Sequence, residues 1–363
     1  MSGTNDNVLI SVSIELLYVG MTVQDDIYDS NGDRLLVTSG TTLSLLHLER
    51  LRNLNNGRLD IFVTRRTHKA MLTKKGNIKA ESISEVEAAA GYVDTKEETF
   101  KLLEEIASDK TVKPESLSAV SDELTEKLES TPPAVVISLI NAMAPVDEYL
   151  QRHSVNVGLL NGLIGRWMGM SDAEVNRLVL IGLLHDCGKV LIPPKILNVP
   201  RRLTVVEYEI IKKHVRHTYD LLSEFPEHIR LASCCHHERI DGSGYTKGLS
   251  NKEIMSEARI TAVSDTYDAI VSRRIYQEPQ SPFTTLALLK KLSVNELDKE
   301  IVDVFIKHIP EDLVGKAVSM SDGTIGVIRH FDANDIEFPT IEVAGRTFKS
   351  NKNLYAISMY NED

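Results

Sequence analysis

The sequence predicts a mainly α-helical protein, in which a helical bundle lies between a small N-terminal α/β accessory domain and a small C-terminal β appendage. From about residue 134 to 310, apolar residues recur at helical spacing with few prolines and short polar breaks, which is typical of a bundle. On either side, short apolar stretches alternate with glycine-containing turns, which is typical of strands. We therefore expect domains at 1–92, which includes a linker, at 93–312 and at 313–363.

The N-terminal region combines strand patterns with one helix pattern. Residues 8–10, 16–18 and 61–63 are strand-like, whereas leucines spaced through 42–54 form one helical stripe. Residues 68–95 are polar and rich in Lys, Glu and Ala, which favours a linker or an exposed helix. This region is most simply interpreted as a folded accessory domain without chemistry of its own.

The central and C-terminal elements follow from the same patterns. Helices are expected over the apolar periodicities at 95–107, 114–129, 175–184 and 260–271. Strands are expected at 317–320, 324–328, 341–343 and 354–357.

Composition and charge exclude some classes of function. The formal net charge is -11, so most of the surface repels a polyanion, which argues against a general DNA- or RNA-binding protein. A small anion held by local cations is still compatible with this charge. The three cysteines suggest no disulfide framework, and we find neither a signal peptide nor an apolar run long enough to span a membrane. We expect a cytoplasmic protein.

Among the histidines of the predicted bundle, six stand out, and several carboxylates lie near them in the sequence. His185 and Asp186 end an apolar helix, where an ionisable pair is costly to bury unless it is paired or binds a metal. One such pair alone would suggest a hydrogen-bonded core dyad. Because ionisable histidines and carboxylates recur at such positions along one bundle, a metal site is favoured over a single dyad. The six histidines are His153, His185, His214, His217, His236 and His237.

Imidazole and carboxylate ligands together suit divalent iron, manganese, nickel or zinc. A bridging carboxylate can hold two such ions, which activate a shared water and neutralise charge on phosphate oxygens. This chemistry suits phosphodiester hydrolysis. His236 and His237 can both face one site only at a helix edge or end, which the following Gly242-Ser243-Gly244 supports. Lys189 could reach a phosphate oxygen, although a solvated lysine is the commoner case.

At these residues the sequence resembles the HD-GYP family, a group of metal-dependent phosphohydrolases with an HD-type helical core. The resemblance is strong over about 145–280, and residues 20–43 resemble a small domain that often precedes HD-GYP domains. The matching pieces are HSVNV at 153–157, HDCGK at 185–189, His214, HHERIDGSGY at 236–245 and AVSDTYDA at 262–269.

The resemblance implies hydrolysis of cyclic di-GMP to pGpG, and in some members to GMP. It implies two metal ions, most simply iron, that share Asp186. One would be held by His153, His185, Asp186 and Asp265, and the other by Asp186, His214, His236 and His237. Catalysis would rest on Asp186 and Lys189, and substrate would contact Lys189, Arg274 and Tyr245. The carboxylates that would orient the ligands are Glu238, Asp241 and Asp268.

The sequence departs from the family at two points. The family Gly-Tyr-Pro is Gly244-Tyr245-Thr246 here, and the Arg-Pro-Tyr-Arg pattern reads Arg274-Ile275-Tyr276-Gln277. The changes lie in loops expected to shape substrate or partner contacts, not among the expected ligands. Some members hold a third metal through a Glu four residues before the first histidine, where this chain has Tyr149, so we expect two metals.

Three alternatives stay open. The chain could be a sensor that binds a cyclic dinucleotide without hydrolysing it, or an HD hydrolase of another nucleotide such as cyclic GMP-AMP. It could also be an interaction module that works through its terminal domains. Expected partners are the cyclic dinucleotide, a GGDEF-type cyclase and a second copy of the chain in a homodimer.

Overall fold

The computed structural model divides the chain into two compact units, one of Met1–Ser82 with Asn361–Asp363 and the other of Ile83–Tyr360. Each unit is described by itself. The structure describes residues 9–13, 27–28, 35–38, 41, 60–64, 101, 112–141, 149–199, 201, 203–272, 281–332 and 335–359.

In the first unit, four short strands are described, and they pair in twos. β1 (Leu9–Ser13) pairs antiparallel with β4 (Asp60–Thr64), and β2 (Ile27–Tyr28) pairs antiparallel with β3 (Leu35–Val37). The strands predicted at 8–10 and 61–63 are thereby confirmed. The strand expected at 16–18 and the helix expected over 42–54 lie outside the described residues, as does most of the helix expected over 95–107.

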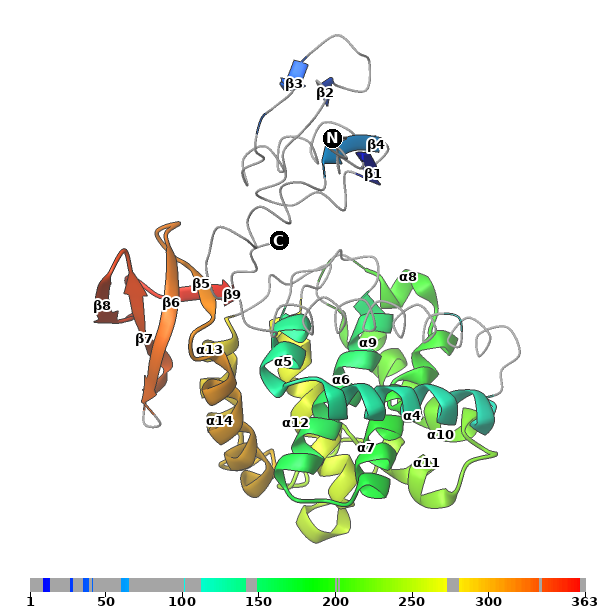
Figure 1. The fold of residues 1–363 in the computed structure, drawn as a ribbon. Helices are drawn as coiled ribbons and strands as arrows, with labels where there is room; N and C mark the ends of the chain where they lie inside the picture. The colour runs from blue at the N-terminus through cyan, green and yellow to red at the C-terminus, as the bar shows by residue number, and fades with distance from the viewer. Residues whose placement is uncertain are drawn as a thin grey trace. The chain divides into compact units, whose positions relative to one another are not determined.

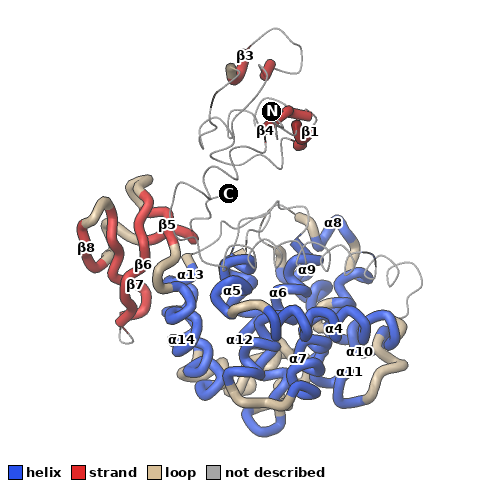
Figure 2. Tube along the Cα trace, viewed as in Figure 1, coloured by secondary structure: helices blue, strands red, loops and turns tan. Residues whose placement is uncertain are grey.

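The second unit is a helical bundle followed by an antiparallel sheet (Figures 1 and 2). The predicted helices at 114–129, 175–184 and 260–271 correspond to α4, α7 and α12. The helices are α4 (Pro114–Ser130), α5 (Pro133–Asn141), α6 (Tyr149–Trp167), α7 (Asp172–Leu184), α8 (Pro194–Leu197), α9 (Val205–Lys212), α10 (His214–Leu221), α11 (Glu227–Cys234), α12 (Ser256–Val271), α13 (Pro282–Leu292) and α14 (Lys299–Leu313), with short 3-10 turns at η3 (Cys187–Leu191) and η4 (Asn251–Glu253).

Helix boundaries follow from local chemistry. Pro114 occupies the first turn of α4, where its missing N–H costs nothing. Ser171 and Glu174 form a capping box at the start of α7, and Thr204 and Glu207 form another at α9. Each box satisfies backbone N–H groups that the first helical turn leaves without partners.

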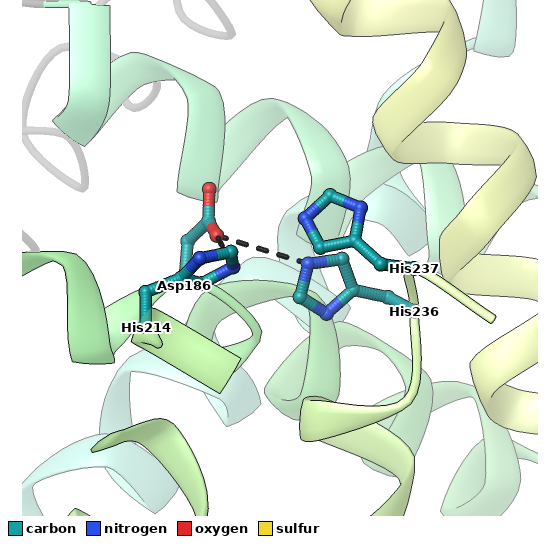
Figure 3. Close-up of side chains that lie close together, drawn as sticks. All are labelled: Asp186, His214, His236 and His237. Atoms are coloured by element: carbon teal, nitrogen blue, oxygen red, sulfur yellow. Dashed lines mark ion pairs between the residues drawn. The ribbon is translucent and has the colours of Figure 1, made fainter. Parts of the chain in front are cut away.

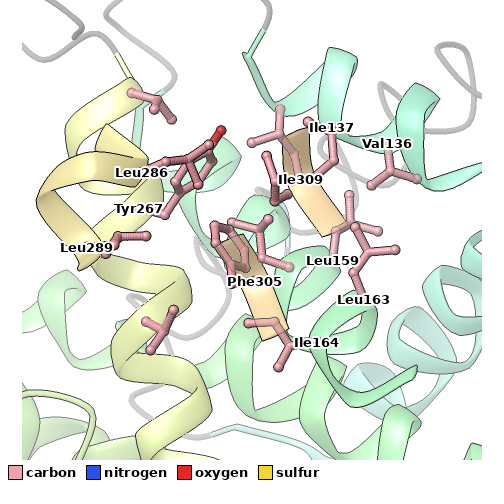
Figure 4. Close-up of a cluster of buried hydrophobic side chains, with 14 of the residues drawn as sticks. Val136, Ile137, Leu159, Leu163, Ile164, Tyr267, Leu286, Leu289, Phe305 and Ile309 are labelled. Atoms are coloured by element: carbon pink, nitrogen blue, oxygen red, sulfur yellow. The ribbon is translucent and has the colours of Figure 1, made fainter. Parts of the chain in front are cut away.

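The bundle is held together by one large apolar cluster between α4, α5, α6, α7, α12, α13 and α14 (Figure 4). Phe305 of α14 lies against Trp167 of α6 and Tyr267 of α12, with ring centroids 6.2 Å and 5.0 Å apart. A buried aromatic pair at such distances adds about 0.5–1.5 kcal/mol beyond the area that it removes from water.

The C-terminal strands form a five-stranded antiparallel sheet in the order β8-β7-β6-β5-β9. Buried residues of this sheet, including Val318, Ile328 and Ile341, belong to the same apolar cluster as the helices. The expected sheet is confirmed, although the strand β8 was not predicted. The sheet and the helical bundle share one apolar core. The strands are β5 (Ala317–Met320), β6 (Ile325–Asp332), β7 (Asp335–Val343), β8 (Arg346–Lys349) and β9 (Ala356–Met359).

Among the helices in the described parts of the chain, none is long and apolar enough to cross a bilayer. Cys187, Cys234 and Cys235 are buried and unpaired, as the sequence predicted.

Candidate metal centre

The predicted ligands converge in the bundle, although they come from five segments of the chain. α6 contributes His153, the end of α7 contributes His185 and Asp186, and α12 contributes Asp265. α10 begins with His214, and His236 and His237 follow directly after α11 ends at Cys234. The pair of histidines therefore lies beyond a helix end, which is what their adjacency in the sequence required.

These side chains form two groups of donors on either side of one carboxylate. His153, His185 and Asp265 make one group, and His214, His236 and His237 make the other with Asp186. Within each group the ligand atoms lie within 4.8 Å of one another. Figure 3 shows His214 and His236 directed at the Asp186 carboxylate, with His237 beside them.

The two oxygens of Asp186 face different groups. Oδ2 lies 3.4 Å from Nε2 of His153 and 3.3 Å from Nε2 of His185. Oδ1 lies 3.2 Å from Nε2 of His214 and 3.8 Å from Nε2 of His236. This placement lets one carboxylate contact a cation on each side.

Backbone carbonyls fix the ring orientation of three histidines. Nδ1 of His185, His214 and His236 lies 2.7, 2.7 and 2.8 Å from the carbonyl oxygen of Gly182, Ile211 and Ser233, respectively. A carbonyl can only accept, so Nδ1 carries the proton, and in the neutral ring Nε2 presents a lone pair.

Several of these inward-facing atoms are buried without a hydrogen-bond partner. They are Nε2 of His214, Nε2 of His236 and Oδ1 of Asp186. Nε2 of His153 and Nε2 of His185 also face each other at 3.2 Å. Buried acceptors without partners are costly, and a cation between them removes that cost. The residues therefore fit divalent metal ions.

Close packing of the backbone brings the donors together. A Cβ on Gly182 of α7 would lie 2.5 Å from Cα of Gly158 in α6, so the two helices cross in direct backbone contact. A Cβ on Gly188 would lie 2.1 Å from the carbonyl oxygen of His214, so η3 lies against the start of α10. Thr218 joins the same segments, because its Oγ1 accepts from the Gly188 N–H at 3.0 Å and donates to the carbonyl of His185 at 3.2 Å.

Asp268 holds His153 from the side away from the cluster. Its Oδ2 lies 2.7 Å from Nδ1 of His153, and its Oδ1 accepts from Asn156 at 2.6 Å and from Ser272 at 3.0 Å. A carboxylate behind a ligating histidine fixes the ring and makes it more basic. The HSVNV motif alone assigned no role to Asn156, but its place three residues after His153 on a helix signals a shared face.

Burial and neighbouring charges shift the titration of the cluster. Burial lowers the pKa of His153, but hydrogen bonds to Asp186, Asp265 and Asp268 outweigh burial and raise it to about 10. Burial and the nearby His185 lower the pKa of His236 to about 3. Burial opposes ionisation of Asp186, yet Lys189 and the histidines hold its pKa well below the usual range. The cluster therefore keeps its carboxylates ionised and holds positive charge among them.

Two of the residues expected at the substrate, Lys189 and Tyr245, lie beside the cluster. Lys189 forms an ion pair with Oδ2 of Asp186, and its side chain is 16 % exposed. The Tyr245 ring stacks on His237 with ring centroids 4.7 Å apart and an angle of 26°. Arg274 lies outside the described residues.

Of the carboxylates expected to orient ligands, Asp268 contacts His153 directly, whereas Glu238 and Asp241 contact the backbone of the loop that follows them. Buried Glu238 accepts from the backbone N–H groups of Thr246, Lys247 and Leu249 at 2.6–2.9 Å and so holds the loop that carries Tyr245. Asp241 is exposed, and its carboxylate accepts from the Ser243 N–H at 2.9 Å in a turn.

Comparison with known proteins defines the class of this domain. Residues 135–301, the part of the chain that carries the site, match the family model of the HD domain. The fold resembles that of an HDG"Y"P protein from Bdellovibrio bacteriovorus, with a TM-score of 0.52 and 16% identity over 82% of this chain and 98% of that one. The similarity to HD-GYP proteins expected from the motifs is thereby confirmed.

Particular relatives share more sequence. A cyclic di-GMP phosphodiesterase of Thermotoga maritima is 37% identical over 47% of this chain and 48% of its own length. A cyclic di-GMP phosphodiesterase of Pseudomonas aeruginosa is 32% identical over 58% of this chain and 51% of its own length. A 3'3'-cGAMP-specific phosphodiesterase of Vibrio cholerae is 28% identical over 52% of this chain and 37% of its own length. The chain spans about half the length of the first two.

Proposed function

We propose that the chain is a metal-dependent phosphodiesterase that hydrolyses cyclic di-GMP to pGpG, to GMP or to both. The observation that carries the proposal is the pair of donor groups on either side of Asp186, whose two oxygens face opposite groups. The relatives that are named cyclic di-GMP phosphodiesterases support the choice of substrate.

We infer two divalent ions, most simply iron, with manganese, nickel and zinc as alternatives, because mixed imidazole and carboxylate donors suit all four. His153, His185, Asp265 and Oδ2 of Asp186 would hold one ion. His214, His236, His237 and Oδ1 of Asp186 would hold the other. When bound, such ions lower the pKa of a water and neutralise charge on phosphate oxygens.

The protein's own residues supply orientation and charge. Asp268 keeps the Nδ1–H of His153 outward, so that its Nε2 faces the cluster. The Lys189 ammonium pairs with Asp186 on the side of His153 and His185, where an ion would take over its place. Released from that pair, Lys189 can bind a phosphate oxygen as a point charge. From the family resemblance, we assign Arg274 to a second phosphate contact.

The proposal includes the cellular location, the source of the substrate and the oligomeric state. We infer that the enzyme works in the cytoplasm, where its three unpaired cysteines stay reduced. A GGDEF-type cyclase would supply the substrate. A homodimer stays a prediction that sedimentation analysis would test.

The test is a product analysis of the metal-loaded protein. Protein purified anaerobically and loaded with Fe²⁺ or Mn²⁺ is incubated with cyclic di-GMP, cyclic GMP-AMP and linear pGpG, and products are separated by chromatography. We expect faster turnover of cyclic di-GMP than of cyclic GMP-AMP. Binding of cyclic di-GMP by the fully loaded protein without any product would contradict the proposal and favour a sensor.

Cyclic GMP-AMP is the second candidate substrate, because relatives from Vibrio cholerae are named as specific for it. The departure from the family at Thr246 also falls in the loop beside the cluster, where its N–H donates to Glu238 at 2.7 Å. A proline at this position could not make that bond. Preferential turnover of cyclic GMP-AMP in the same assay would establish this alternative.

A further inference from the structure

An aromatic row leads outward from the metal centre to the protein surface. Solvent reaches the cluster at His237, which is 19 % exposed, whereas His153 and His185 are fully buried. The Tyr245 ring covers one side of His237, and the Tyr208 ring lies beyond it, with centroids 6.4 Å apart and an angle of 80°. Three rings therefore follow one another from a predicted metal ligand to the surface.

One cation lies over both tyrosines. Nζ of Lys212 is 5.4 Å from the centroid of Tyr208 and 5.6 Å from that of Tyr245. Lys212 also pairs with the exposed Glu209 at 2.6 Å, so its charge is partly neutralised on the solvent side. A ligand phosphate near the row could replace this carboxylate as its partner.

The outer ring is open and lies beside apolar side chains. Tyr208 is 46 % exposed, and Val205 and Val206 at the start of α9 are more exposed still. Val205, Tyr208 and Lys212 follow one another at helical spacing, so they line one face of α9. Exposed apolar side chains that lie together mark a binding surface more often than scattered ones do.

The ring next to the metal centre is held firmly. Three backbone N–H groups of the loop after Tyr245 donate to the Glu238 carboxylate, and the Tyr245 N–H donates to the carbonyl of His237 at 3.2 Å. The loop thus holds Tyr245 against His237, so the hydrogen bonds to Glu238 fix the position of the middle ring of the row. Preorganised aromatic surfaces bind flat ligands at little entropic cost.

We propose that Tyr208, Tyr245 and Lys212 form a subsite for one purine base of the substrate, which stacks on the open face of Tyr208. The inference rests on the proposed function and specifies how that site holds its substrate. A dinucleotide whose phosphate lies at the metal ligands places its base outward, along the row, and Lys212 attracts the adjoining phosphate. Stacking tolerates any purine, so the subsite contributes affinity rather than choice between guanine and adenine.

Steady-state kinetics of the metal-loaded full chain tests the subsite. Tyr208→Ala should raise KM for cyclic di-GMP roughly tenfold, the scale of one lost base stack, with kcat within about twofold of wild type. Tyr208→Phe and Tyr208→Trp should restore KM, because the ring and not the hydroxyl stacks. Lys212→Gln should also raise KM. Metal content should stay unchanged in all variants.

Two matched controls separate the subsite from general surface effects. Tyr355→Ala removes a ring that is 42 % exposed but lies beside the C-terminal sheet, and Lys213→Gln removes an exposed neighbouring charge. Both should leave KM unchanged. An unchanged KM in Tyr208→Ala, or a Tyr208→Phe variant as defective as Tyr208→Ala, would overturn the subsite.

Direct binding keeps the subsite separable from the proposed function. If the wild type hydrolyses nothing but binds cyclic di-GMP, and Tyr208→Ala raises Kd roughly tenfold, the subsite stands while the proposed activity falls. Hydrolysis by wild type and Tyr208→Ala with equal KM leaves the activity and removes the subsite. A wild type that neither binds nor hydrolyses any cyclic dinucleotide overturns both.

Discussion

At the scale of the residue, the site consists of three buried carboxylates whose negative charge is offset by protonated or cationic neighbours. Asp186, Asp265 and Asp268 all have pKa values held below the usual range, although burial opposes this. His153 touches all three, which is why its pKa rises to about 10. A metal ion competes with the proton on this histidine for the same lone pair.

Metal binding should therefore release protons at neutral pH. His153 carries its proton below a pKa of about 10, whereas the lowered pKa of His236, about 3, means that its ring is already neutral. We expect His153 to release roughly one proton as metal binds, and metal affinity to rise up to about tenfold per pH unit from 6.5 toward 10. Calorimetry at pH 7.5 in buffers of different ionisation enthalpy measures this, and binding heats that are equal in all buffers would refute it.

Asp268 should matter for metal affinity although it lies behind the ligand. In Asp268→Asn the amide no longer carries the charge that holds His153, and affinity for one ion should fall about 10–100-fold. Competition with a chelator measures the affinity of both ions. Asp322→Asn is the matched control, since this exposed carboxylate caps a turn at Thr324. Equal metal affinity in Asp268→Asn and wild type would contradict the assigned role.

At the scale of the element, the site depends on how closely the backbones approach. The candidate ligand residues could be proposed from the sequence because their types and order resemble those of a known family. Their convergence could not, since it rests on contacts such as that of Gly188 with His214, which no local pattern encodes. The same holds for Glu238, whose partners are backbone N–H groups eight or more residues further along the chain.

Gly188→Ala should damage the site through the backbone. The new methyl group would meet the carbonyl oxygen of His214 and the N–H of Thr218, so η3 and α10 must separate. We expect a loss of about 1–3 kcal/mol in unfolding free energy and reduced metal binding. Gly165→Ala is the control, because its methyl group would come closer than 3.4 Å only to the tip of the Leu178 side chain, at 2.7 Å, and to no backbone atom among its three nearest neighbours. Normal metal content in Gly188→Ala would show that the contact does not position the ligands.

At the scale of the whole molecule, local patterns predicted the element types well and the boundaries of the core less well. Strand alternation after residue 313 correctly predicted a sheet. It could not show that Val318, Ile328 and Ile341 pack into the same cluster as Phe305 and Tyr267, because shared burial is a property of the tertiary structure.

The shared core predicts that damage to the sheet destabilises the helices. Ile341→Ala removes a fully buried side chain from β7 and should cost about 2–5 kcal/mol of unfolding free energy. The Tm measured from helical circular dichroism should fall as well. Ile325→Ala, at an exposed position on β6, should leave it unchanged. If Ile341→Ala left the Tm of the helical signal unchanged, the sheet would fold independently of the helices.

The most direct test of the central claim is to measure metal content and cyclic di-GMP hydrolysis together in wild type and Asp186→Ala. Because the two Asp186 oxygens face separate donor groups, losing this one side chain should weaken both sites at once. We predict about two ions per chain and hydrolysis in the wild type, against few ions and no product in the variant. Full turnover by Asp186→Ala, or a wild type that holds close to three ions, would contradict the account.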